Sequence, residues 1–242
     1  MKRFSVALAA LVTVACLANA QAAPEASDSV ALKLMAKCKV ASGGSALDRP
    51  AAFHETGTIV RDGKSGTYEM YADLHALRTA GIHTIEGKIG GGGYDGTRAW
   101  HFGPDGKVAI TNDPAQLAEE KLGAYLTIGG YFYPERFPAR FNYLGRKKAG
   151  LKYYDVVAAT PDGTHSIDLW LDAHSHRLMR VSFVSGDLKF EGELLRYRVV
   201  DGTRIGFENR QYEGDHKMLQ TLATYEYVPL DPERFTPPSF GQ

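Results

Sequence analysis

From Phe53 onwards, apolar and polar residues alternate along the chain in short runs rich in Thr, Val, Ile, Tyr and Phe. The alternation is clearest at Ile167, Leu169 and Leu171, which share one side, while Asp168 falls on the other. A period of two residues predicts a strand with one buried and one solvated face. Most of the chain is therefore predicted to be β-structure.

Turn signals rich in Asp and Gly separate these runs. They are Arg61-Asp62-Gly63-Lys64, Pro104-Asp105-Gly106, Pro161-Asp162-Gly163, Ser185-Gly186-Asp187, Asp201-Gly202 and Glu213-Gly214-Asp215. Asp and Gly supply the positive φ that tight hairpin turns require, and strands joined by such turns are antiparallel. The pattern predicts a β-meander of about ten strands, which is typical of a barrel or a sandwich.

Two segments have helical spacing instead. The first begins at Asp28, ends at Gly43-Gly44 and carries an apolar stripe of Val30, Leu34, Cys38 and Ala41. The second is capped by Asn112-Asp113-Pro114, ends at Gly129-Gly130 and carries a stripe of Ala118, Leu122, Tyr125 and Leu126. The aromatic sequence Tyr131-Phe132-Tyr133-Pro134 follows it. This second segment either covers an apolar ligand surface on a curved sheet or simply closes the core.

The N-terminus has the layout of a secretory signal peptide. Lys2 and Arg3 precede an apolar run that is too short to span a bilayer, and Ala18-Asn19-Ala20 offers a cleavage site. We therefore expect a signal peptide over residues 1–20, a linker over 21–27 and one domain over 28–242, without a transmembrane segment in the mature chain. The expected location is the periplasm. Lipid attachment at Cys16, as in an outer-membrane lipoprotein, is the less favoured alternative.

Composition gives no sign of nucleic-acid binding. Without Lys2 and Arg3, 26 basic residues face 28 acidic ones, so there is no basic excess. The predicted mature chain retains only Cys38, which excludes an intrachain disulfide. Its place on an apolar stripe favours a buried core residue over a reactive thiol.

No pattern of residues indicates catalysis, a metal or a cofactor. His174-Ser175-His176 is the closest histidine pair but lacks a third ligand, and we interpret it as a solvated turn. The run 90–93 of four glycines lacks the Lys and Ser/Thr of a phosphate-binding loop and is predicted to be a flexible connection. A set of carboxylates is expected to face solvent: Asp155, Asp168, Asp172, Glu191 and Glu193.

Three stretches carry a family resemblance. They are Tyr94-Asp95-Gly96-Thr97-Arg98-Ala99-Trp100-His101-Phe102, the series from Leu144-Gly145 through Leu169-Trp170-Leu171-Asp172 to Arg180-Val181, and the ending Phe235-Thr236-Pro237-Pro238. In this order they resemble the LolA/LolB-type outer-membrane lipoprotein-sorting family over about residues 30–238. The resemblance implies a curved, incomplete antiparallel β-barrel of about eleven strands whose concave face is covered by helices.

The sequence also resembles the accessory domain that precedes retropepsin-like protease domains, but it lacks the Asp-Thr/Ser-Gly triplet of the protease. It departs from the carrier family as well. Where that family has an Arg-Pro pair that latches its lid, this chain has Ala72-Asp73, and Arg78 follows six residues later.

The favoured function is binding or carriage of an apolar small molecule, a lipid or a lipoprotein acyl chain. The candidate ligand-binding residues are Trp100, Phe102, Leu122, Leu126, Tyr131 and Phe132. Trp100 and Phe102 equally suit a filled core. Two other functions stay open: an envelope module that binds a protein partner or senses, and a hydrolase of unknown type.

Overall fold

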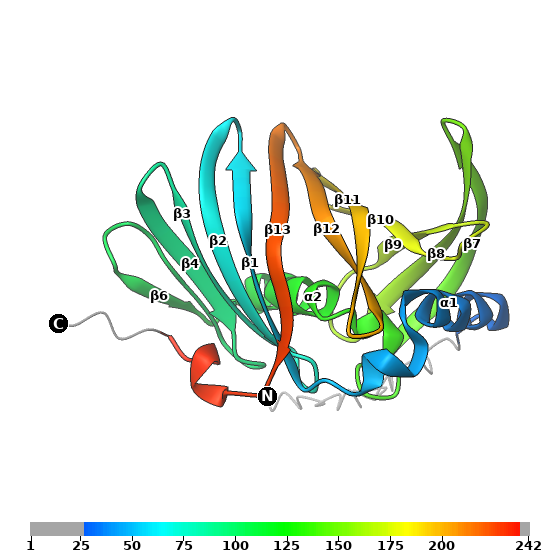
Figure 1. Cartoon of the computed structure of the whole chain (residues 1–242), viewed down its shortest axis with the longest axis horizontal. Helices are drawn as coiled ribbons and strands as arrows, with labels where there is room; N and C mark the ends of the chain where they lie inside the picture. The colour runs from blue at the N-terminus through cyan, green and yellow to red at the C-terminus, as the bar shows by residue number, and fades with distance from the viewer. Residues whose placement is uncertain (1–26, 238–242) are drawn as a thin grey trace, which may run out of the picture.

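The computed structural model describes residues 27–237. The predicted signal peptide (1–20), with Cys16, and almost all of the predicted linker lie outside the described residues. The predicted fold class is confirmed, because one antiparallel sheet curves around a helix without closing (Figure 1). The sheet has thirteen strands rather than about eleven.

The sheet consists of two arms, and within each arm strands that are consecutive in sequence lie side by side. Their order across the sheet is β6-β5-β4-β3-β2-β1-β13-β12-β11-β10-β9-β8-β7. The first arm comprises β1 (Ala52–Arg61), β2 (Lys64–Asp73), β3 (Arg78–Ile85), β4 (Lys88–Tyr94), β5 (Ala99–Phe102) and β6 (Val108–Thr111). The second comprises β7 (Ala139–Ala149), β8 (Lys152–Pro161), β9 (Ile167–Asp172), β10 (Leu178–Ser185), β11 (Leu188–Val200), β12 (Thr203–Glu213) and β13 (His216–Val228). Pairing of β1 with β13 joins the two arms in the middle of the sheet.

The turn predictions are confirmed, because all six signals lie between consecutive strands. At the β1–β2 turn, Asp62 and Gly63 have φ of 50° and 82°. Asp201 and Gly202 repeat this pair of positive φ values between β11 and β12. This is the backbone of the tight turns that favour Asp-Gly, so local chemistry sets these hairpins.

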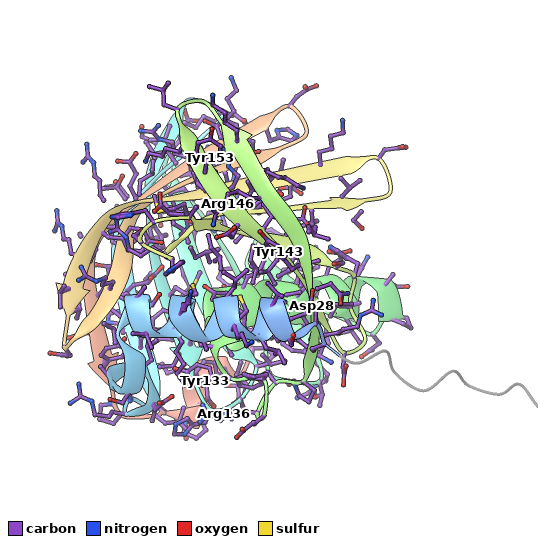
Figure 2. All side chains as sticks on the ribbon, turned by 90° about the vertical axis from the view of Figure 1, so that its right-hand side faces the viewer. Asp28, Tyr133, Arg136, Tyr143, Arg146 and Tyr153 are labelled. Carbon is purple, nitrogen blue, oxygen red and sulfur yellow. The ribbon has the colours of Figure 1, made fainter. Side chains whose placement is uncertain are left out.

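Both predicted helices are present. In α1 (Ser29–Ser42), Asp28 accepts a hydrogen bond from the Val30 amide, and Gly43 ends the helix. Its buried face differs from the predicted stripe, because Val30 is exposed while Ala31 and Met35 are buried. Figure 2 shows Asp28 beside Tyr143 of β7, whose amide donates to the Asp28 carboxylate at 3.3 Å.

The second helix, α2 (Pro114–Thr127), connects the two arms. Asp113 caps it by accepting from the Gln116 amide, and the short helix η2 (Gly130–Phe132) follows. Ala124 packs against Tyr94 and Ala99 of the first arm. On the other side, the Lys121 ammonium donates to the Asp162 carbonyl at 2.5 Å. The helix therefore lies across the concavity of the sheet (Figure 1).

The prediction for residues 90–93 is wrong. These glycines form the middle of β4; all four pair with β3, and Gly91 to Gly93 also pair with β5. A Cβ at Gly93 would lie 2.6 Å from the Trp100 indole, and one at Gly91 would lie 2.8 Å from the Phe102 ring. Glycine is needed here because two aromatic side chains lie directly over the strand.

Two further short helices lie within residues 27–237: η1 (Gly44–Asp48) follows α1, and η3 (Pro232–Phe235) follows β13. The main core combines α1, α2 and the inner faces of β8 to β10. It includes the fully buried Ile167, Leu169 and Leu171, as the alternation predicts.

One of the five carboxylates departs from the prediction. Asp155 on β8 is buried because both faces of that strand are covered. The other four, Asp168, Asp172, Glu191 and Glu193, are partly exposed.

Candidate ligand-binding cavity

A cavity of about 540 Å³ lies between the inner face of the sheet and the segment formed by α2 and η2. Cross-strand pairing defines the inner face: Phe53 pairs with Ala72 on β2 and with Tyr227 on β13, and Glu55 pairs with Met70 and Tyr225. Directly opposed residues point to the same side of a sheet. The apolar part of the wall is formed by Phe53, Met70, Leu74, Leu178, Val181, Phe183, Phe190, Leu194, Ile205, Met218 and Leu222.

Four of the six predicted ligand-binding residues line this cavity. Leu122 and Leu126 project from α2, and Tyr131 and Phe132 come from η2. The helix cap and the Gly129 turn, with φ of 66°, place these side chains over the sheet. The Tyr131 and Phe132 rings pack edge to face, with their centroids 4.6 Å apart.

The segment after η2 is anchored at two places, to η1 and to the β2–β3 turn. The Tyr133 hydroxyl donates to the Leu47 carbonyl at 2.6 Å, and the Arg136 guanidinium donates to the Leu74 carbonyl at 2.6 Å. Arg136 also lies over the Tyr133 ring, as Figure 2 shows. One end of the cavity cover is therefore fixed.

Trp100 and Phe102 lie on the opposite face of the sheet. Trp100 pairs with Gly93, which pairs with Ala80, and this row continues to Tyr71 and His54 on the outer side. The two aromatic side chains form a separate cluster with Ala80 and Phe235. The Trp100 indole N–H donates to the Phe235 carbonyl at 3.4 Å. Among the candidate residues, these two are not brought to the cavity.

Arg78 belongs to this outer face too. Its guanidinium forms an ion pair with the fully buried Asp73, the Nε–Oδ2 distance being 2.8 Å. Asp73 also accepts hydrogen bonds from the amides of His75 and Ala76. Arg78 therefore stabilises the β2–β3 turn and does not contact the cavity cover in this structure.

The cavity wall also carries polar side chains: Glu55, Glu119, Thr127, Asn209, Gln211, Gln220, Tyr68, Tyr131, Tyr133, Tyr225 and Tyr227. Glu55 is half-buried there, and burial raises the pKa of its carboxyl to about 7, although Tyr68 and His54 oppose the rise. Burial also raises the pKa values of Tyr131 and Tyr225 well above their ordinary range, so both phenols are neutral at physiological pH. On the same wall, the Gln211 side-chain amide of β12 donates to the side-chain carbonyl of Gln220 on β13 at 3.2 Å.

Sequence reasoning missed Glu55 and Tyr68. A signal was present in the alternation of β1, since Phe53, Glu55, Gly57 and Ile59 share one parity. A carboxylate among apolar residues of a predicted inner face indicates a buried polar position. The sequence alone did not show which of the two sets of alternate residues in β1 faces the inside of the sheet.

Over residues 27–237 we find no group of three or more His, Cys, Asp or Glu residues placed to hold a metal ion. Cys38 is fully buried, and burial raises the pKa of its thiol to about 12, which makes it unreactive. No helix in that part of the chain is long and apolar enough to cross a membrane.

The curved open sheet with helices across its concave face is a LolA-like fold. A LolA superfamily protein from Nitrosomonas europaea superimposes with a TM-score of 0.56 at 14% identity, covering 85% of this chain and 97% of that one. An uncharacterized conserved protein from Thermus thermophilus gives a TM-score of 0.36 at 9% identity, over 88% and 97% of the two chains. A chain of the MucA/MucB complex of Pseudomonas aeruginosa gives 0.23 at 11%, over 83% and 100%. No family model and no curated protein sequence matches the chain.

Proposed function

We propose that this chain is an exported periplasmic protein that binds an apolar ligand, such as the acyl chain of a lipid or lipoprotein, in the cavity between the sheet and α2. The observation that carries the proposal is the cavity itself. Its volume of about 540 Å³ falls in the range of small-molecule sites, and its wall is mainly apolar. Leu122, Leu126, Tyr131 and Phe132 are the proposed covering contacts.

Burial of an alkyl chain supplies sufficient free energy. Each buried methylene contributes about 0.8 kcal/mol, so about ten contribute roughly 8 kcal/mol before the costs of association are subtracted. A net binding free energy of several kcal/mol supports reversible binding. This suits a carrier, which must release its ligand.

Some polar contacts between α2 and the second arm are exposed and weak. Glu119 accepts from the Ser185 hydroxyl at 3.1 Å and lies 3.4 Å from the His165 imidazole. Exposed contacts of this kind contribute less than about 1 kcal/mol each. We infer that ligand release requires α2 to move relative to β10, which also loosens the core packing of Leu122 and Tyr125, while the segment around Tyr133 stays anchored.

Gly123 allows a direct test of the cavity. It lies on α2 at the cavity wall, and a Cβ placed there would meet no atom within 4 Å. We expect Gly123→Trp to obstruct the cavity and to weaken binding of the neutral apolar dye N-phenyl-1-naphthylamine by at least about tenfold. Dye fluorescence titration provides the measurement.

Gly123→Ala is the matched control. It should retain dye affinity and raise the free energy of unfolding by up to about 1 kcal/mol, because glycine weakens a helix interior. Equal dye binding by the wild type and Gly123→Trp would contradict the proposed site. Native mass spectrometry of the protein from the periplasm, followed by organic extraction, identifies the natural ligand. An extract without lipid, together with absent dye binding, favours a protein-binding role instead.

A further inference from the structure

Glu55 is an ionisable group in a mainly apolar wall. Its partners across β2 and β13 are Met70 and Tyr225, and the β1 residues on either side with the same orientation are Phe53 and Gly57. Burying a carboxylate without a partner is costly, so such a side chain requires a counter-ion, a hydrogen-bond donor or protonation. No ion pair between Glu55 and another described side chain is formed.

Tyr68 is a second polar group at the same place, and its interaction with the Glu55 carboxyl lowers the pKa of Glu55. It lies on β2, is 6% exposed and lines the cavity near Glu55. Within residues 27–237 its buried hydroxyl makes no hydrogen bond of acceptable geometry. Buried hydroxyls in folded proteins almost always have a partner, so a ligand group that reaches Glu55 can also pair with the Tyr68 hydroxyl.

The charges around the cavity have one sign. The charged residues on its wall are Glu55 and Glu119, and no lysine, arginine or histidine lines it in the described part of the chain. The other titratable groups that line the cavity are tyrosines, which burial keeps neutral: Tyr68, Tyr131, Tyr133, Tyr225 and Tyr227. His54, beside Glu55 in β1, points to the outer face, where it contacts Glu69 and Glu226 at 2.9 Å.

We propose that the cavity selects amphiphiles with an amino head group, whose N–H donors are accepted by the Glu55 carboxylate and the Tyr68 oxygen while the alkyl chain lies against the cover. This rests on the proposed function and specifies its ligand class. An ammonium group offers three donors and a positive charge, which match two acceptors and a negative charge. A fatty-acid carboxylate or a lipid phosphate would instead place a second anion beside Glu55 without a cation to balance it.

The test compares three ligands of equal chain length: dodecylamine, dodecanol and dodecanoate. Each displaces the neutral dye from the full chain at pH 8, where the amine is protonated and the Glu55 carboxyl is mostly ionised. We expect the amine to bind roughly ten- to hundredfold more tightly than the alcohol, because a charge-assisted hydrogen bond in a desolvated site has that effect. The carboxylate should bind least tightly.

Glu55→Gln removes the charge and keeps the shape. It should weaken amine binding by roughly tenfold or more and so remove most of the preference for the amine over dodecanol. The same loss should follow in the wild type when the pH falls from 8 to 6, because Glu55 becomes protonated. Glu193→Gln, on the outer face of β11, is the matched control and should keep the wild-type order of the three ligands.

The outcomes separate the inference from the proposed function. If the carboxylate binds as tightly as the amine, or if Glu55→Gln leaves amine affinity unchanged, the head-group assignment is overturned while apolar binding stands. If none of the three ligands displaces the dye, or the dye does not bind, the proposed function itself fails.

Discussion

At the scale of single residues, Glu55 and Asp155 show how the surroundings of a carboxyl decide its pKa. Asp155 is buried but accepts two hydrogen bonds from Arg146 at 3.0 Å and one from Tyr143 at 2.9 Å. The Arg146 guanidinium, helped by Tyr143, holds the pKa of Asp155 below its usual range. Glu55 has no such cation, so burial dominates and its pKa rises. Asp155 is paired with a cation within the fold, and Glu55 is not.

This difference predicts that ionised Glu55 lowers the free energy of unfolding, by an amount that depends on pH. A carboxyl with a raised pKa in the folded state favours folding in its protonated form, so stability falls as pH rises from about 4.5 to about 7. We expect Glu55→Gln to raise the free energy of unfolding at pH 8 by up to about 3 kcal/mol, and to have little effect near pH 4. Urea unfolding at both pH values measures the effect. A destabilised variant at pH 8 would show that Glu55 has a partner within the fold.

At the scale of elements, β4 illustrates a strand whose glycines are required by its neighbours. Trp100 and Phe102 of β5 project over Gly93 and Gly91, and η3 covers both aromatic side chains from outside. A strand of glycines is intrinsically weak, because glycine loses the most backbone entropy on folding. The apolar area buried by the two rings offsets this loss.

We therefore expect Gly93→Val to destabilise the protein by about 1–3 kcal/mol, since its side chain would overlap both the Trp100 ring and the Thr79 carbonyl. Thermal unfolding followed by circular dichroism gives the change. Gly81→Ala on β3 is the control, because a Cβ there lies at an ordinary 3.4 Å from its nearest neighbour. Equal stability of the two variants would contradict this account of β4.

At the scale of the whole molecule, the two faces of the sheet are covered by different elements. The inner face surrounds the cavity and is covered by α2 and η2. The outer face of the first arm is covered near its edge by η3, where Phe235 is 2% exposed. Because the sheet backbone separates the two clusters, changes in one are expected to leave the other intact.

Phe235→Ala tests this independence. It should destabilise the protein by about 3 kcal/mol and shift Trp100 fluorescence to longer wavelength, because water reaches the indole. Affinity for the apolar dye should stay within about twofold of the wild type. Trp100→Phe assigns the emission, since Trp170 is the second tryptophan. A large loss of dye binding in Phe235→Ala would place Trp100 and Phe102 in the binding site after all.

Local sequence determined the elements of this protein. The Asp-Gly turns, the Asp28 and Asp113 caps and the alternation at residues 167–171 act over a few residues, so both helices and the antiparallel order could be predicted. A resemblance in motif order then indicated the curvature and the helical cover, which the fold confirms. The apolar stripe of 118–126 and the aromatic run that follows it predicted that Leu122, Leu126, Tyr131 and Phe132 lie over the sheet, and all four line the cavity.

Only the tertiary structure decided which side of each strand faces the cavity. In β5 both sides are covered, Ala99 by α2 and Trp100 by η3, so burial alone could not assign the inner face. Glu55 is the converse case. Its polarity predicts a position facing solvent, but its cross-strand pairing with Met70 and Tyr225 places it on the inner face of the sheet. Side-chain parity is local, but the direction in which a sheet curves depends on contacts between residues far apart in the chain.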